Sequence, residues 1–137
     1  MIGRANPLAP PLRLRIDEDG DPPAVAGTAR FGPQYEGPPG HVHGGYLAAA
    51  FDEVLGMAQS LGGKPGMTGT LTVRYRSPTP LHLEVDLRGW VERVEGRKIF
   101  TRGTLHAEGR LCAQAEAVFI SIDFRALQVL AGRREKP

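Results

Sequence analysis

Alternation of apolar and polar residues with a period of two predicts β-strands along most of the chain. The runs with this pattern occupy residues 12–16, 24–31, 68–76, 83–94, 99–107 and 111–122. Glu-Gly-Arg turns at 95–97 and 108–110 join the last three runs closely enough to form hairpins. We therefore expect an antiparallel sheet.

The pattern changes to a helical one over residues 45–61, between the second and third predicted strands. Apolar and small residues lie on every side of this helix, which is typical of a buried helix. Gly62-Gly63, followed by Pro65, predicts its end. The expected architecture is α+β, an antiparallel sheet with one long buried helix inserted between its early and late strands.

One curved sheet can cover only part of such a helix. The positions Phe51, Val54 and Ala58 form one stripe, and Ala48, Asp52 and Leu55 form another. Both stripes cannot face the same concave surface. We therefore expect the second stripe to meet a partner subunit, in a homodimer or in a homotetramer built through the sheets.

The helix carries two acids, and between Glu36 and Glu84 these are the only ones, Asp52 and Glu53. The helical neighbours of Asp52 offer no hydrogen bond and no opposite charge, so burying its carboxylate costs several kcal/mol unless another group satisfies it. Two interpretations follow. Either acid forms an ion pair with an arginine of the sheet, or Asp52 is a desolvated base or nucleophile. Glu53 is the weaker candidate for the chemical role.

The start of the helix, His43-Gly44-Gly45, is the second candidate site, because its first amides are unpaired and unshielded by side chains. The helix dipole favours an oxyanion there; alternatively, the glycines only provide a tight entry into the helix. From Gly45 to Asp52 the helix rises about 10 Å. A carbonyl bound at the helix start is beyond the reach of Asp52 in the same chain. If both features serve one reaction, a two-fold dimer must join Gly44 of one chain to Asp52 of the other.

Length and charge narrow the possible functions. The chain has 137 residues, which fits one domain, expected over residues 12–123 between a flexible arm (1–11) and a tail (124–137). Seventeen basic and 15 acidic residues leave a net charge of +2, too little to indicate nucleic-acid binding. No apolar run is long enough to cross a membrane or form a signal peptide. A single cysteine, Cys112, favours the reducing cytoplasm.

The pattern resembles the hot-dog-fold acyl-CoA thioesterases of the phenylacetate-pathway and thioesterase-superfamily-member type. The resemblance covers residues 37–122. It rests on His43-Gly44-Gly45 separated by six residues from Asp52, on Thr68 sixteen residues after Asp52, and on the run Tyr75-Arg76-Ser77-Pro78-Thr79-Pro80-Leu81. It implies one helix wrapped by a five- to six-stranded antiparallel sheet.

The same resemblance implies hydrolysis of an acyl-CoA thioester without a metal or organic cofactor. Asp52, contributed across the dimer interface, is the implied nucleophile or general base, and the Gly44 amide the oxyanion donor. Thr68 orients the attacking water or the Asp52 carboxylate, and His43 shapes the site and fixes the helix start. Gly45 and Tyr46 are expected next to the substrate.

Some residues leave alternatives open. Some members of the family carry an asparagine several residues before the His-Gly-Gly motif; it is missing here, and His41 is a candidate to replace it. Arg74 and Arg76 belong to a basic region that either binds the phosphates of coenzyme A or is a solvated sheet edge. A metal held by His41, His43 and Asp52 is disfavoured because no third histidine lies nearby.

The alternative functions are a hot-dog enoyl-CoA hydratase or dehydratase and a non-catalytic acyl-CoA-binding module.

Overall fold

The computed structural model describes residues 10–61 and 66–122. In chain order, the elements are β1 (Leu12–Asp17), β2 (Ala24–Arg30), a 3-10 turn η1 (Pro33–Tyr35), α1 (Gly44–Ser60), β3 (Gly66–Tyr75), β4 (Glu84–Glu95), β5 (Lys98–Ala107) and β6 (Arg110–Ser121). The predicted strands, hairpins and helix are confirmed. The helix begins one residue earlier than predicted, at Gly44. The proposed helix stop at Gly62-Gly63, the tail and most of the N-terminal arm lie outside the described residues.

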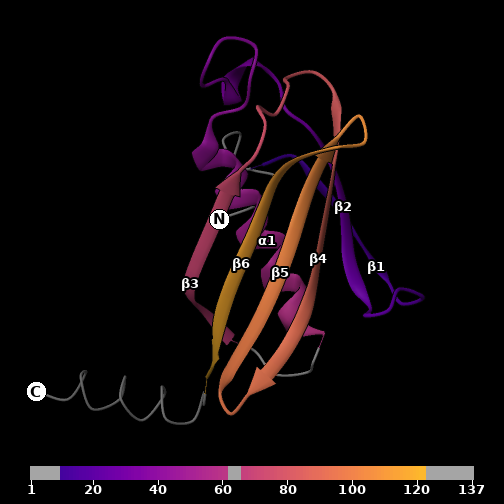
Figure 1. Cartoon of the computed structure of the whole chain (residues 1–137), viewed down its shortest axis with the longest axis vertical. Helices are drawn as coiled ribbons and strands as arrows, with labels where there is room; N and C mark the ends of the chain where they lie inside the picture. Colours follow the sequence, from indigo (N-terminus) through magenta and orange to yellow (C-terminus); the bar gives the residue numbers. More distant parts are fainter. Residues whose placement is uncertain (1–9, 62–65, 123–137) are drawn as a thin grey trace, which may run out of the picture.

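All strand pairings are antiparallel, and the strands lie in the order β1-β2-β4-β5-β6-β3. The chain inserts α1 between β2 and β3, and the curved sheet wraps around it (Figure 1). This is the hot-dog architecture that the resemblance implies. β1 and β3 form the two edges of the sheet. Within the described ranges, no helix is both long enough and apolar enough to span a bilayer.

The inner face of the sheet and one side of α1 form the hydrophobic core. Two glycines that pair across β4 and β5, Gly89 and Gly103, lie directly beneath the helix. A Cβ atom on Gly89 would come within 2.8 Å of Val54 Cγ1 and 2.9 Å of Leu55 Cδ2. The bare backbone at this pair therefore lets α1 approach the sheet more closely than any side chain would allow.

Only one side of α1 is buried within the chain, although apolar and small residues surround it. The buried residues are Leu47, Ala50, Phe51, Val54, Leu55, Ala58 and Gln59. The other side, which we call the open face of α1, is half-buried or exposed and consists of Gly45, Ala48, Ala49, Asp52, Glu53, Gly56, Met57 and Ser60. The sequence prediction for Leu55 was wrong, because this residue faces the sheet rather than sharing the open face with Asp52.

We expect Gly89→Ala to lower the free energy of unfolding by about 1–3 kcal/mol, because the added methyl group overpacks the contact between β4 and α1. The measurement is urea denaturation followed by circular dichroism at one fixed protein concentration. Lys98→Ala on the exposed outer face of β5 is the control, with an expected change within about 0.5 kcal/mol. Equal stability of the two variants would contradict the close packing at Gly89.

Candidate functional site at the start of α1 and the edge strand β3

The backbone at the start of α1 is held by His43, the N-cap residue. Its Nδ1 accepts a hydrogen bond from the Gly45 amide at 2.9 Å. The accepting Nδ1 carries no proton, so in the neutral ring the proton is on Nε2. His43 thus caps the start of the helix, whereas its role in a reaction, implied by the resemblance, stays a prediction. The prediction that the Gly45 amide is unpaired was wrong, because the His43 ring satisfies it.

The Gly44 amide remains available. Among residues 10–61 and 66–122, no group accepts a hydrogen bond from it. The carbonyl oxygen of the same residue accepts a hydrogen bond from the Tyr75 hydroxyl at 2.7 Å. A Cβ atom on Gly44 would lie 3.1 Å from both Cζ and the hydroxyl oxygen of Tyr75. Glycine is therefore the residue that leaves this close approach undisturbed.

Sequence reasoning gave no role to Tyr75, although its position carried a signal. It continues the inward-facing series of Leu71 and Val73 on β3, and its cross-strand partner is the buried Ala113. Tyr75 nevertheless remains 53% exposed, because it lies on the edge strand beside the helix start. Partial desolvation raises the pKa of its hydroxyl above the usual value.

A cleft of about 360 Å³ opens beside the helix start, and we call it the helix-start cleft. Its lining residues are Pro38, His41, Val42, Gly44, Leu47, Tyr75, Arg76, Ser77, Pro78 and Thr79. The Nδ1 atom of His41 lies 2.9 Å from the carbonyl oxygen of Pro39, which can only accept. Nδ1 therefore carries the proton, and Nε2 of the neutral ring is left as an acceptor. His41, the candidate replacement for the missing asparagine, thus lies in the same cleft as Gly44.

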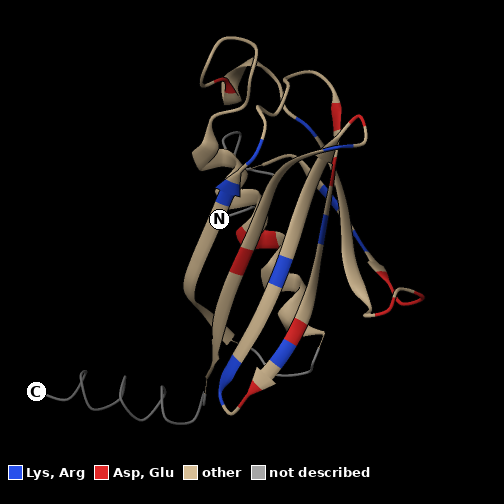
Figure 2. Cartoon of the chain, in the orientation of Figure 1, with Lys and Arg blue, Asp and Glu red and all other residues tan. Residues whose placement is uncertain are grey.

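The acidic pair lies at the middle of α1, where Figure 2 shows the negative charge of the helix. Asp52 is half-buried, and its Oδ1 accepts a hydrogen bond from the Thr68 hydroxyl at 2.8 Å. Within the part of the chain that the structure describes, neither Asp52 nor Glu53 forms an ion pair. The expected arginine partner is therefore not found there. Among the described residues, the second carboxylate oxygen of Asp52 has no hydrogen-bond partner.

A β-bulge brings Thr68 onto the same side of β3 as the helix. Strict alternation places Thr68 with Thr70 and Thr72, on the outer face of the sheet. The register of β3 shifts between Thr68 and Thr70, so Thr68 pairs with the inward-facing Phe119. The extra residue, Gly69, turns Thr68 inward toward Asp52.

The remaining predicted substrate contacts are divided between two faces of the molecule. Tyr46 is half-buried and packs edge-on against Tyr35 and His43, with ring centroids 4.9 and 6.0 Å apart. Arg74 points to the outer face of the sheet, opposite to Tyr75 and Gly44. Arg76, just past the end of β3, lines the helix-start cleft and also a hollow on the outer face. No group of three potential metal ligands was found in the described ranges.

A family model described as the thioesterase superfamily matches residues 39–113, which contain α1, Asp52, Thr68 and all of the helix-start cleft except Pro38. The chain belongs to the thioesterase superfamily. It is 40% identical over 93 residues to the acyl-coenzyme A thioesterase THEM4 of Xenopus laevis, an alignment that covers 66% of this chain and 42% of that protein. It is 29% identical over 93 residues to human acyl-coenzyme A thioesterase THEM5, covering 66% and 38%. The chain thus spans about two fifths of the length of these relatives.

Solved structures of the superfamily share the fold. One thioesterase superfamily protein superimposes with a TM-score of 0.76 at 45% identity, over 82% of this chain and 57% of the other. A hypothetical thioesterase protein from Streptococcus pneumoniae, crystallised with coenzyme A, superimposes with a TM-score of 0.72 at 19% identity, over 80% and 87%. These likenesses confirm the hot-dog fold.

We expect Tyr75→Phe to lower the free energy of unfolding by about 0.5–1 kcal/mol, the lower part of the range for a neutral hydrogen bond, because the bond to Gly44 is partly exposed. Urea denaturation at fixed protein concentration measures the change. Because the folded-state pKa of Tyr75 is raised, its hydroxyl stabilises the fold below the unfolded pKa, and this contribution is lost as pH rises through the folded pKa. The difference between wild type and variant should therefore shrink above about pH 10. A difference that stays constant up to unfolding would contradict the contact.

Proposed function

We propose that this chain hydrolyses acyl-CoA thioesters to a free acid and coenzyme A. The observation that carries the proposal is the Gly44 amide, which has no partner in the described ranges and borders the helix-start cleft at the positive end of α1. The acyl-coenzyme A thioesterases THEM4 and THEM5, which are longer proteins, support the choice of substrate.

In the proposed reaction, the thioester carbonyl oxygen accepts a hydrogen bond from the Gly44 amide. Charge builds up on this oxygen as the carbonyl carbon is attacked, and the helix terminus stabilises it. Tyr75 and His43 act as positioning residues, since they hold the carbonyl oxygen of Gly44 and the amide of Gly45. Gly45 and Tyr46 shape the entrance beside them.

Asp52 supplies the nucleophile in one of two ways. Its carboxylate attacks the carbonyl carbon and forms an anhydride that water then cleaves, or it takes a proton from a water molecule that attacks directly. In both routes the C–S bond breaks and coenzyme A leaves as the thiol. Thr68 donates to Oδ1 of Asp52 and so fixes the carboxylate, whose Oδ2 has no partner in the described residues and is available for the chemistry.

The Gly44 amide and the Asp52 carboxylate of one chain lie too far apart to act on the same carbonyl group. From Gly44 to Asp52 the helix rises about 12 Å, which exceeds the few ångströms over which a nucleophile must attack. We therefore assign each active site to two chains of a homodimer, with the Gly44 amide of one chain facing Asp52 and Thr68 of the other.

Two surfaces support this dimer. The open face of α1 contains Asp52 among residues such as Gly45, Ala48 and Ala49, whose small side chains allow a second helix to approach closely. The ten-residue strand β3 lies beside it at the sheet edge, and one of its sides pairs with no strand among the described residues. Pairing of β3 with a second copy would bring the two open faces together. The tetramer built through the sheets stays a prediction, and it is compatible with coenzyme A binding at Arg74 only if its contacts leave that part of the outer face uncovered.

The proposed compartment is the cytoplasm. The only cysteine in the sequence, Cys112, is buried with a free thiol. A reducing compartment preserves such a thiol.

We expect Asp52→Asn to lower kcat for acyl-CoA hydrolysis by about two to four orders of magnitude, because the amide can neither attack nor accept the proton. Release of coenzyme A, measured with a thiol reagent over short, medium, long and aryl acyl chains, provides the assay and also identifies the acyl group. Glu53→Gln is the matched control, since it removes the neighbouring charge on the same helix and should change kcat less than tenfold. Wild-type turnover by Asp52→Asn would refute the assignment.

Mixing two inactive variants tests the shared site. Gly44→Pro removes the proposed oxyanion donor at the first helical position, where proline is tolerated. His43 already has φ −63° and ψ 134°, a conformation that suits the residue before a proline, and the Tyr75 ring has to shift slightly.

We expect mixed dimers of Asp52→Asn and Gly44→Pro chains to regain activity. Each mixed dimer contains one site with an intact Gly44 amide and an intact Asp52. Random association therefore restores about a quarter of the wild-type rate per chain. No regained activity in folded mixed dimers, or an active monomer by light scattering, would overturn the dimer model.

A further inference from the structure

We propose that the hollow on the outer face of the sheet, formed by β3, β4, β5 and β6, binds the adenine nucleotide end of the coenzyme A thioester. This inference rests on the proposed function and extends it to a surface that lies opposite to Gly44 and Asp52. The hollow has a volume of about 260 Å³. Its lining includes Arg74, Arg76, Trp90, Arg102, Gln114 and Glu116. We call it the outer hollow.

Two of its arginines have charge available for a ligand. Arg102 is already paired, at 2.8 Å with Glu92 and at 3.7 Å with Glu116. Arg74 and Arg76 form no ion pair within the described residues, and the one hydrogen bond of the Arg76 side chain goes to the neutral Gln114, at 2.8 Å. The outer hollow thus places two guanidinium groups, on β3 and just past its end, that have no ion-pair partner in the described residues. The one acid in its lining, Glu116, is paired with Arg102. Such free guanidinium groups suit phosphate groups.

The same hollow contains an aromatic side chain. Trp90 on β4 is half-buried and lies directly across from Arg102 on β5. An indole ring offers a planar apolar surface on which a nucleobase can stack. Guanidinium groups and an indole side by side therefore match a ligand that is both anionic and aromatic, which describes the nucleotide end of coenzyme A.

The outer hollow is connected to the proposed reaction site. Arg76 lines both the outer hollow and the helix-start cleft, where Gly44 and Tyr75 lie. In an acyl-CoA thioester a long flexible arm separates the reacting carbonyl from the nucleotide. A substrate with its carbonyl on the Gly44 amide can therefore pass along Ser77 and Pro78 at the end of β3 and reach Arg74 from there.

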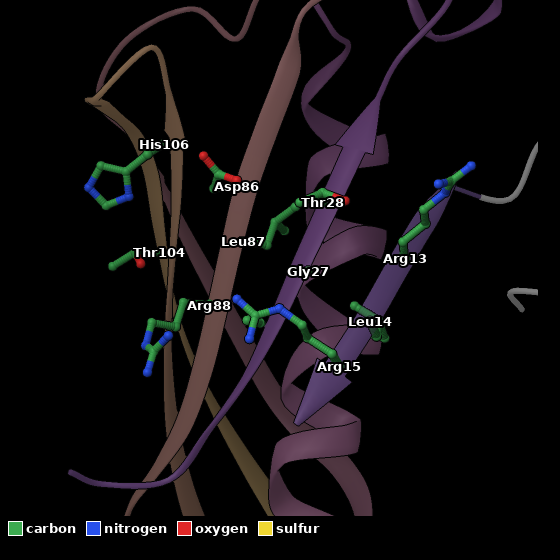
Figure 3. A pocket seen from close by; sticks show the side chains of 11 residues that line it. Arg13, Leu14, Arg15, Gly27, Thr28, Asp86, Leu87, Arg88, Thr104 and His106 are labelled. Atoms are coloured by element: carbon green, nitrogen blue, oxygen red, sulfur yellow. The ribbon is translucent and has the colours of Figure 1, made fainter. Parts of the chain in front are cut away.

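A second, larger hollow on the same face is less suited to this ligand (Figure 3). It measures about 480 Å³ and contains Arg13, Arg15 and Arg88, but Arg88 is paired with Asp17 at 2.8 Å, and Asp86 adds negative charge. In Figure 3 the side chain of Arg13 points away from the other labelled residues. This hollow shares no residue with the helix-start cleft, so it provides a matched control.

The kinetic test compares one acyl group on two thiols. Acyl-CoA carries the nucleotide, whereas the acyl thioester of N-acetylcysteamine lacks it. We expect Arg74→Ala to raise KM for acyl-CoA about tenfold, the loss of one charge-assisted contact at a solvated site. The ratio of kcat/KM for acyl-CoA to that for the truncated thioester should fall by the same factor. Arg15→Ala, in the neighbouring hollow, should leave the ratio within twofold.

A binding test uses Trp90, the only tryptophan in the sequence. Adding adenosine 3′,5′-bisphosphate should change its fluorescence saturably in the wild type, and the apparent Kd should rise about tenfold in Arg74→Ala. An unchanged kinetic ratio, or no fluorescence response in wild-type protein that hydrolyses acyl-CoA, would overturn the proposal. If the wild type releases no thiol from either thioester, the proposed function fails, and the fluorescence titration still decides whether the outer hollow binds a nucleotide.

Discussion

A single curved sheet can bury only one side of a helix, and the other features of this molecule depend on that limit. Here the sheet takes the side of α1 that carries Phe51, Val54 and Leu55, each fully buried. The paired glycines of β4 and β5 let the helix lie close to the sheet, so this side is packed tightly. What remains is the open face, which contains the carboxylates of Asp52 and Glu53 among small side chains. A charge at the centre of such a surface makes sense if the surface is used for chemistry.

The bulge in β3 links the open face of α1 to the candidate site, because it brings Thr68 to Asp52. An edge strand has one free side, and a bulge there changes which face a residue points to without disturbing the rest of the sheet. The register shift at Gly69 turns the hydroxyl of Thr68 toward the helix, whereas Arg74, beyond the shift, stays on the outer face. The strand thus offers a hydrogen-bond donor to α1 and the guanidinium group of Arg74 to the opposite side. In the proposed function, β3 therefore contributes to binding both the reacting thioester and the nucleotide end of the same substrate.

Much of the fold could be predicted from the sequence, because both periodicities are clear. The alternating runs and the helical run between them correspond to the observed elements within one or two residues at nearly every boundary, and Asp52 was singled out because a carboxylate is costly on an apolar helix. Contacts between distant segments could not be predicted in the same way. The meeting of Tyr75 with Gly44 joins residues 31 positions apart and depends on how the edge strand lies beside the helix. The inward turn of Thr68 depends on a shift of one residue that alternation alone does not show. Leu55 was assigned to the wrong face, because apolar positions all round the helix gave no contrast between its sides.

The peptide group between Gly44 and Gly45 is held at both ends. Its carbonyl oxygen accepts from the Tyr75 hydroxyl, and its N–H donates to the ring of His43. With both of its dipole ends tied to side chains, this peptide plane cannot rotate without breaking one of the two bonds. The preceding peptide group carries the Gly44 N–H and is joined to this one through the Gly44 Cα atom. Its orientation is therefore restrained as well. A donor fixed in advance needs little reorganisation when negative charge develops in front of it, so the cost of orienting the dipole is met during folding rather than in each catalytic cycle.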